Sequence, residues 1–131
     1  MRKWLLVATA AGALSSCGGS SQSDSCASGT SQSGAYTVTA CANGAPARGV
    51  DTFVFTVADA NGVPQPGLNF TVEPWMPDMN HGSPGMPSIS DLGGGKYQVS
   101  NVVFTMPGVW QLRTTFSSPS GEDANPQFNI D

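Results

Sequence analysis

Soft metal donors are concentrated in one short stretch of this sequence. Residues 75–87 contain three of the five methionines and the only histidine of the chain. Met76, Met79 and His81 lie within six residues, and Met86 follows five residues later. Thioether sulfur and imidazole nitrogen are neutral ligands that suit Cu(I), whereas Ca²⁺ and Mg²⁺ prefer oxygen. The pattern therefore predicts a Cu(I) or Ag(I) site formed by these four side chains.

Three further residues could surround such an ion. Trp75 adjoins the first methionine, and the face of an indole ring can cover a cation. Met106 and Trp110 form a second soft and aromatic pair, which the fold could bring to the same end of the domain. Zn²⁺ fits less well because the chain has one histidine and no free thiolate is expected.

The same residues also allow a structural interpretation. Methionine fills irregular apolar gaps, so Met76 and Met79 could pack over an open end of the domain. His81 could hydrogen-bond a backbone carbonyl in that case. The stretch would then be a hydrophobic plug, or a contact to a partner protein, with no metal. The sequence leaves both interpretations open.

The N-terminus has the organisation of a bacterial lipoprotein signal. A short basic head precedes an apolar run over residues 4–14, which is too short to span a bilayer. Residues 14–17, Leu-Ser-Ser-Cys, resemble the lipobox, in which the peptidase cuts before a cysteine that carries a diacylglycerol. We expect residues 1–16 to be the signal peptide and Cys17 to be lipidated, so that acyl chains anchor the protein in a membrane.

The residues after this cysteine indicate the location and the domain boundary. An aspartate at the next position commonly retains a lipoprotein at the inner membrane, and here that position is Gly18. The expected location is the outer membrane facing the periplasm, or the cell surface, if the organism has two membranes. Residues 17–33 are small or polar, which predicts a flexible tether, and a single domain is expected over residues 34–131.

Two cysteines remain once Cys17 is lipidated. An exported protein meets an oxidising compartment, so we expect Cys26 and Cys41 to form a disulfide. Such a link would close a short loop worth about 3 kcal/mol on the chain-entropy account. Metal binding by two thiolates would instead require reduced cysteines in that compartment.

Composition and motifs argue against two classes of function. Without the signal, three cations stand against nine acids, a formal charge of −6, so nucleic acid is not an expected partner. His81 has no activated cysteine or serine motif around it, because Gly82-Ser83-Pro84 lacks the elbow that exposes a nucleophile. The carboxylates are scattered at turns and strand edges. We therefore expect no enzymatic activity.

Alternation of apolar and polar residues with period two begins at Tyr36. It predicts strands within residues 36–41, 52–57, 68–72, 86–92, 97–104, 109–116 and 127–130. No window of ten residues after the signal shows an uninterrupted helical stripe. About seven short strands separated by glycine and proline turns predict an all-β, immunoglobulin-like β-sandwich.

Five segments resemble, in order, the YtkA-like domain, which is related to the FixH-like proteins. They are residues 46–53, 59–64, 76–82, 94–97 and 106–112. The most specific are Met-Pro-x-Met-x-His and Met-Pro-Gly-x-Trp, and the resemblance covers residues 36–116. It implies an immunoglobulin-like sandwich in exported bacterial proteins, often near copper handling or cytochrome oxidase assembly. FixH-like proteins carry a transmembrane helix, which this chain replaces with a cleavable signal.

The leading hypothesis is a lipid-anchored carrier that binds Cu(I) or Ag(I) and passes it to a partner protein. Neutral ligands would allow transfer to a stronger thiolate or imidazole site. The alternative is a structural or protein-interaction module without metal.

Overall fold

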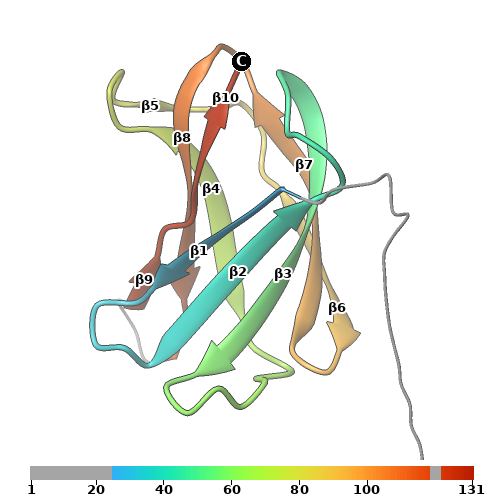
Figure 1. The fold of residues 1–131 in the computed structure, drawn as a ribbon, viewed down its shortest axis with the longest axis vertical. Coiled ribbons are helices and arrows are strands. Elements are labelled where there is room, and N and C mark those ends of the chain that lie inside the picture. The colour runs from blue at the N-terminus through green and yellow to red at the C-terminus, as the bar shows by residue number, and fades with distance from the viewer. Residues whose placement is uncertain (1–24, 119–121) are drawn as a thin grey trace, which may run out of the picture.

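The computed structural model describes residues 25–118 and 122–131 and shows two antiparallel sheets packed face to face (Figure 1). The first sheet has the order β1 (Ser25–Thr30), β2 (Tyr36–Ala42), β3 (Gly49–Asp59), β7 (Lys96–Phe104) and β6 (Ser88–Gly93). The second has the order β10 (Gln127–Ile130), β8 (Gly108–Phe116), β4 (Phe70–Met76) and β5 (His81–Gly82), and β9 (Glu122–Ala124) also pairs with β8. The predicted all-β sandwich is confirmed.

The core lies between the two sheets and follows the predicted alternation. The inward positions of β3, β7 and β8 are almost fully buried, and they are mostly aromatic or branched. Aromatic rings join the two layers. Phe55 stacks on Phe70 with ring centroids 6.3 Å apart, and Phe53 lies 5.1 Å from Phe128. Burial of these large side chains is the main term that holds the sheets together.

The structure differs from the expected tether over its last part. Residues 17–33 were expected to be flexible, but β1 occupies Ser25–Thr30 and pairs in register with β2. A β-carbon on Gly29 would lie 2.8 Å from the backbone nitrogen of Asn125, so the chain passes too close to its neighbour for a larger residue. The small residues of β1 therefore reflect close packing as well as polarity.

The predicted disulfide between Cys26 and Cys41 is confirmed. The two cysteines are direct cross-strand partners, with their Cα atoms 4.1 Å apart, so the bond fixes the edge strand β1 to β2. The predicted signal peptide, the lipidation site Cys17 and residues 17–24 lie outside the described residues.

The two long sides of the sandwich are closed differently. On one side β1 contacts β9 and β10, so the edges of the two sheets meet. On the other side the first sheet ends with β6, and the two-residue strand β5 covers only the end of β4. No helix of the described residues is long and apolar enough to cross a membrane.

Candidate functional site

The stretch of soft donors folds as a β-hairpin at one end of the sandwich. Strand β4 ends at Met76 and β5 begins at His81, so four residues form the connecting turn. The backbone N–H of Asn80 donates to the carbonyl of Met76 over 2.8 Å and closes the turn. Asn80 has φ of 54°, a left-handed conformation that asparagine tolerates better than most residues. Figure 1 shows this hairpin at the same end as the connection between β7 and β8.

The hairpin register brings Met76 and His81 together. They are direct partners in the antiparallel β4–β5 pair, so both side chains point to the inner face of the sheet. The adjacent β4–β8 register ends at Trp75 and Gln111, which places Trp110 level with Met76 on that same inner face. The rings of His81 and Trp110 meet edge to face, with centroids 6.0 Å apart. One thioether, one imidazole and one indole are thus cross-strand neighbours on the inner face of the second sheet.

The histidine ring is held in a defined orientation. His81 Nδ1 lies 2.9 Å from the carbonyl oxygen of Gly82, so in the neutral ring Nδ1–H donates to that carbonyl. The second nitrogen, Nε2, then carries the lone pair. This is the arrangement found for metal-binding histidines, in which one ring nitrogen is fixed by a hydrogen bond and the other binds the ion.

The β7–β8 connection contributes a second methionine to this end. The indole N–H of Trp110 donates to the carbonyl of Met106 over 2.9 Å, and the partly buried side chain of Met106 packs against the core. Gly108 follows as the first residue of β8, and the methyl group of Met76 lies 2.6 Å from the position of a β-carbon there. The two connections therefore pack directly on each other through Met76.

Met79 and Met86 are placed differently from Met76. Met79 lies in the turn of the hairpin and is 53 % exposed. Met86 is 69 % exposed and lines a pocket beside Glu73. Glu73 precedes Met76 by three residues of strand, which is about 10 Å. Met79 thus lies in the turn that joins Met76 to His81, whereas Met86 lines a pocket beside an earlier part of β4.

Trp75 lies on the opposite face of the sheet from Met76. It is the partner of Gly82 in the hairpin and faces outward. The guanidinium of Arg113 lies over the Trp75 ring, 4.6 Å from the ring centroid, in a cation–π contact. The indole near the Met76 and His81 pair is therefore that of Trp110, which is fully buried.

Sequence reasoning allowed a hydrogen bond from His81 to a backbone carbonyl but did not identify Gly82 as the partner. It missed Gly108, which receives the end of Met76. The signal for Gly108 was present, because a glycine between proline and a strand often marks a close approach of the backbone. Within residues 25–118 and 122–131, no three His, Cys, Asp or Glu side chains are grouped as a metal site.

The fold and the site define a small two-sheet β domain with a Met and His hairpin at one end. A comparison with protein families identifies this domain. The chain matches the model of the YtkA-like family over residues 30–115 and belongs to that family. The match runs from the end of β1 to β8, so it includes both connections at the site. No curated protein and no solved structure matches the chain.

Proposed function

We propose that this domain binds and carries Cu(I), or Ag(I), at the pair formed by Met76 and His81. The observation that supports this most is the hydrogen bond from His81 Nδ1–H to Gly82, which leaves Nε2 as an acceptor on the face that Met76 shares. A thioether and a neutral imidazole suit a soft monovalent ion.

A third donor would come from one of two methionines. Met79 is exposed in the hairpin turn, where its flexible side chain can rotate toward the pair. Met106 lies in the adjoining connection and its backbone is fixed by Trp110. An exposed third donor would suit a carrier, since it can leave the ion when a stronger thiolate or imidazole of a partner protein approaches. We place this carrier on the membrane through lipidated Cys17, and we propose no enzymatic activity.

A titration of the full chain with Cu(I) against a competing chelator tests the site. We expect Met76→Leu and His81→Gln each to weaken binding by roughly tenfold or more, since each removes one donor. Met86→Leu is the matched control and should leave the affinity unchanged, because Met86 is exposed and lines a pocket beside Thr71, Val72 and Glu73. Met79→Leu and Met106→Leu identify the third donor.

One result would overturn the proposal: a double variant Met76→Leu with His81→Gln that retains the affinity of the original chain. Leucine matches the volume of methionine closely, so Met76→Leu should keep the fold. Circular dichroism of each variant verifies this.

A second candidate function is a hydrophobic closure of the sandwich without metal. It is favoured by the burial of Met76, which is 2 % exposed and packs toward Gly108. The hydrogen bond of His81 to the Gly82 carbonyl is also the bond that this interpretation expects. In that case Cu(I) would bind weakly, and Met76→Leu and His81→Gln would not change that binding. The same titration therefore separates the two functions.

A further inference from the structure

Strand β4 has a free edge along most of its length. On one side it pairs with β8 from Phe70 to Trp75, but on the other only Trp75 and Met76 pair with β5. Among the described residues, no strand covers the edge between Phe70 and Pro74. An uncovered edge presents backbone donors and acceptors to an incoming strand.

The backbone groups that face this edge can be assigned. The N–H of Ser117 donates to the carbonyl of Asn69 over 3.1 Å, so residue 69 is directed toward β8. Ladder bonds alternate along a strand, and the N–H and C=O groups of Phe70 and Val72 are therefore directed to the free edge. Pro74 has the same phase, and its lack of an N–H is tolerated at an edge. Phe70 is 7 % and Val72 2 % exposed, so this edge is unpaired but largely covered, and an incoming strand reaches it only through the pockets that these residues line.

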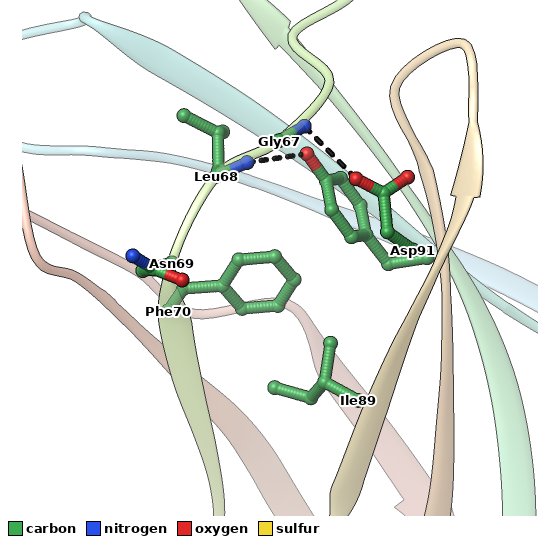
Figure 2. A pocket seen from close by; sticks show the side chains of 7 residues that line it. Gly67, Leu68, Asn69, Phe70, Ile89 and Asp91 are labelled. Carbon is green, nitrogen blue, oxygen red and sulfur yellow. Dashed lines mark hydrogen bonds between the residues drawn. The ribbon is translucent and has the colours of Figure 1, made fainter.

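Two pockets lie along this edge. The first, of about 370 Å³, lies between residues 67–70 and the side chains of Ile89 and Asp91 (Figure 2). The second, of about 350 Å³, lies between residues 71–73 and the loop that carries Ser83 and Met86. The β4 lining of the first pocket ends at Phe70 and that of the second begins at Thr71, so the two pockets lie next to each other along β4, and we call them together the groove.

The groove contains polar groups without partners. The hydroxyl oxygen of Ser83 is buried and makes no hydrogen bond within the described residues. It lines the second pocket beside Val72, whose backbone groups face the same space. Buried polar groups nearly always have partners in folded proteins. An extended backbone lying in the groove would supply both donors and acceptors.

The charge of the groove indicates which kind of extended segment it would bind. Glu73 lines the second pocket and Asp91 the first, and no basic residue lines either. Asp91 is fixed at the rim, since its two carboxylate oxygens accept from the N–H groups of Gly67 and Gly93 over 3.0 and 2.7 Å. Arg113 is the cross-strand partner of Glu73, but its guanidinium lies over Trp75 instead. The groove is therefore complementary to cationic side chains.

We propose that this groove binds an extended segment of a partner protein, rich in lysine or arginine, as an added strand on β4. The segment would pair with Phe70 and Val72, place cations near Glu73 and Asp91, and lay apolar residues against Met86 and Ile89. Strand addition to an unpaired sheet edge is a common mode of peptide recognition. Residues 18–24 of this chain contain no lysine or arginine, so they do not meet the charge requirement.

Amide hydrogen exchange of the metal-free full chain tests the proposal, with the peptide acetyl-Lys-Val-Lys-Val-Lys-amide as probe. We expect the peptide to slow exchange of the Phe70 and Val72 amides by roughly tenfold or more, and to leave the central strand amide of Val57 unchanged. The matched peptide with glutamate in place of lysine should have no effect. Glu73→Gln should weaken binding by roughly threefold at low salt. Asp78→Asn, in the hairpin turn, should not.

The outcomes are distinguishable. Unchanged exchange at both amides with the peptide in millimolar excess overturns the proposal, and so does equal protection by the glutamate peptide. If the Phe70 and Val72 amides are protected without peptide, and more so at higher protein concentration, a second copy of the chain occupies the edge and the proposal is overturned. Sedimentation would then detect the dimer. Val72→Pro removes the edge N–H, as Pro74 already does, and should abolish peptide binding. Met76→Leu with His81→Gln should retain it, so this test is independent of the metal site.

Discussion

The methyl group of Met76 lies 2.6 Å from the point where a β-carbon on Gly108 would stand. Gly108 also has φ of 136°, a conformation that other L residues rarely adopt. The backbone conformation therefore favours glycine at this position, and a larger residue would also have to displace the flexible end of the Met76 side chain. The contact joins the β4–β5 hairpin to the β7–β8 connection and so fixes the end of the sandwich where the candidate donors lie.

Replacing this glycine should destabilise the domain. We expect Gly108→Ala to lower the free energy of unfolding by about 1–3 kcal/mol, from backbone strain and displacement of Met76. Gly49→Ala is the matched control, because Gly49 has φ of 108° with nothing within 4 Å of its β-carbon position. Urea denaturation measures the free energy of unfolding of both variants. The loss in Gly49→Ala reports backbone strain alone, and any additional loss in Gly108→Ala reports the contact with Met76. In a Met76→Ala background the effect of Gly108→Ala should shrink; an equal effect in both backgrounds would show that the contact contributes nothing.

Tyr97 stabilises the connection between β3 and β4 through its hydroxyl group. The hydroxyl accepts from the N–H of Leu68 over 3.0 Å and donates to the carbonyl of Gln65. Burial raises the pKa of Tyr97, and the nearby carboxylate of Asp91 adds to that increase. The hydroxyl therefore stays protonated and keeps its donor at neutral pH.

We expect Tyr97→Phe to lower the free energy of unfolding by about 1–3 kcal/mol, because two backbone groups lose their partner. Tyr36→Phe is the control, since the Tyr36 hydroxyl makes a single, exposed bond to Ser118. Its effect in chemical denaturation should be smaller. Equal losses in the two variants would contradict the bridging role of Tyr97.

The strands were predictable where burial imposes an alternating pattern. Runs such as those of β3 and β8 carry large apolar residues at every second position, so period and burial agree. Strand β1 was missed because its inward positions are small. They pack against a close backbone instead of filling a wide core, as Gly29 shows. Small polar composition alone cannot separate such an edge strand from a linker.

The candidate site was predictable in part. Met76 and His81 are five residues apart, and a four-residue hairpin turn brings residues at that spacing face to face. Which face Trp75 would take, and where Met86 would lie, depend on the strand register and on the path of residues 83–87. Those are set by packing between the sheets, and local spacing in the sequence does not encode them.

The disulfide should determine whether β1 stays attached. Cys26 and Cys41 are 15 positions apart, and closing a loop of this size is worth about 3 kcal/mol on the chain-entropy account. We expect the double variant Cys26→Ser with Cys41→Ser to lose roughly this amount. The β1 amides of this variant should exchange faster than those of the original chain, and the increase should be larger than for the amide of Val38 in β2. Wild-type protein treated with reductant should match the variant, and unchanged stability in both would contradict the role given to the bond.

Glu122 should make the domain less stable in acid. Hydrogen bonds from the side chains of Ser31 and Ser33 lower the pKa of Glu122, and the Ser33 hydroxyl lies 2.6 Å from its carboxylate. A depressed pKa in the folded state adds stability above the unfolded pKa and loses it as the pH falls through the folded pKa. Glu122→Gln should therefore flatten the fall in melting temperature below about pH 4.5. An identical acid profile would show that these bonds form equally in the unfolded chain.

Asp51 should act in the opposite direction. Burial raises the pKa of its carboxyl group, although the backbone N–H of Ala47 partly offsets this, and one carboxylate oxygen is buried without a hydrogen bond within the described residues. A raised pKa means that the folded state favours the protonated form, so stability is lost as the pH rises from the unfolded pKa through the folded one. We expect Asp51→Asn to be more stable than the original chain at neutral pH by about 0.5 kcal/mol. The advantage should vanish at a pH below the unfolded pKa, where the aspartate is protonated in both states. Thermal melts of the two proteins across this range measure the difference, and an advantage that persists unchanged in acid would assign it to packing of the amide instead of to the charge.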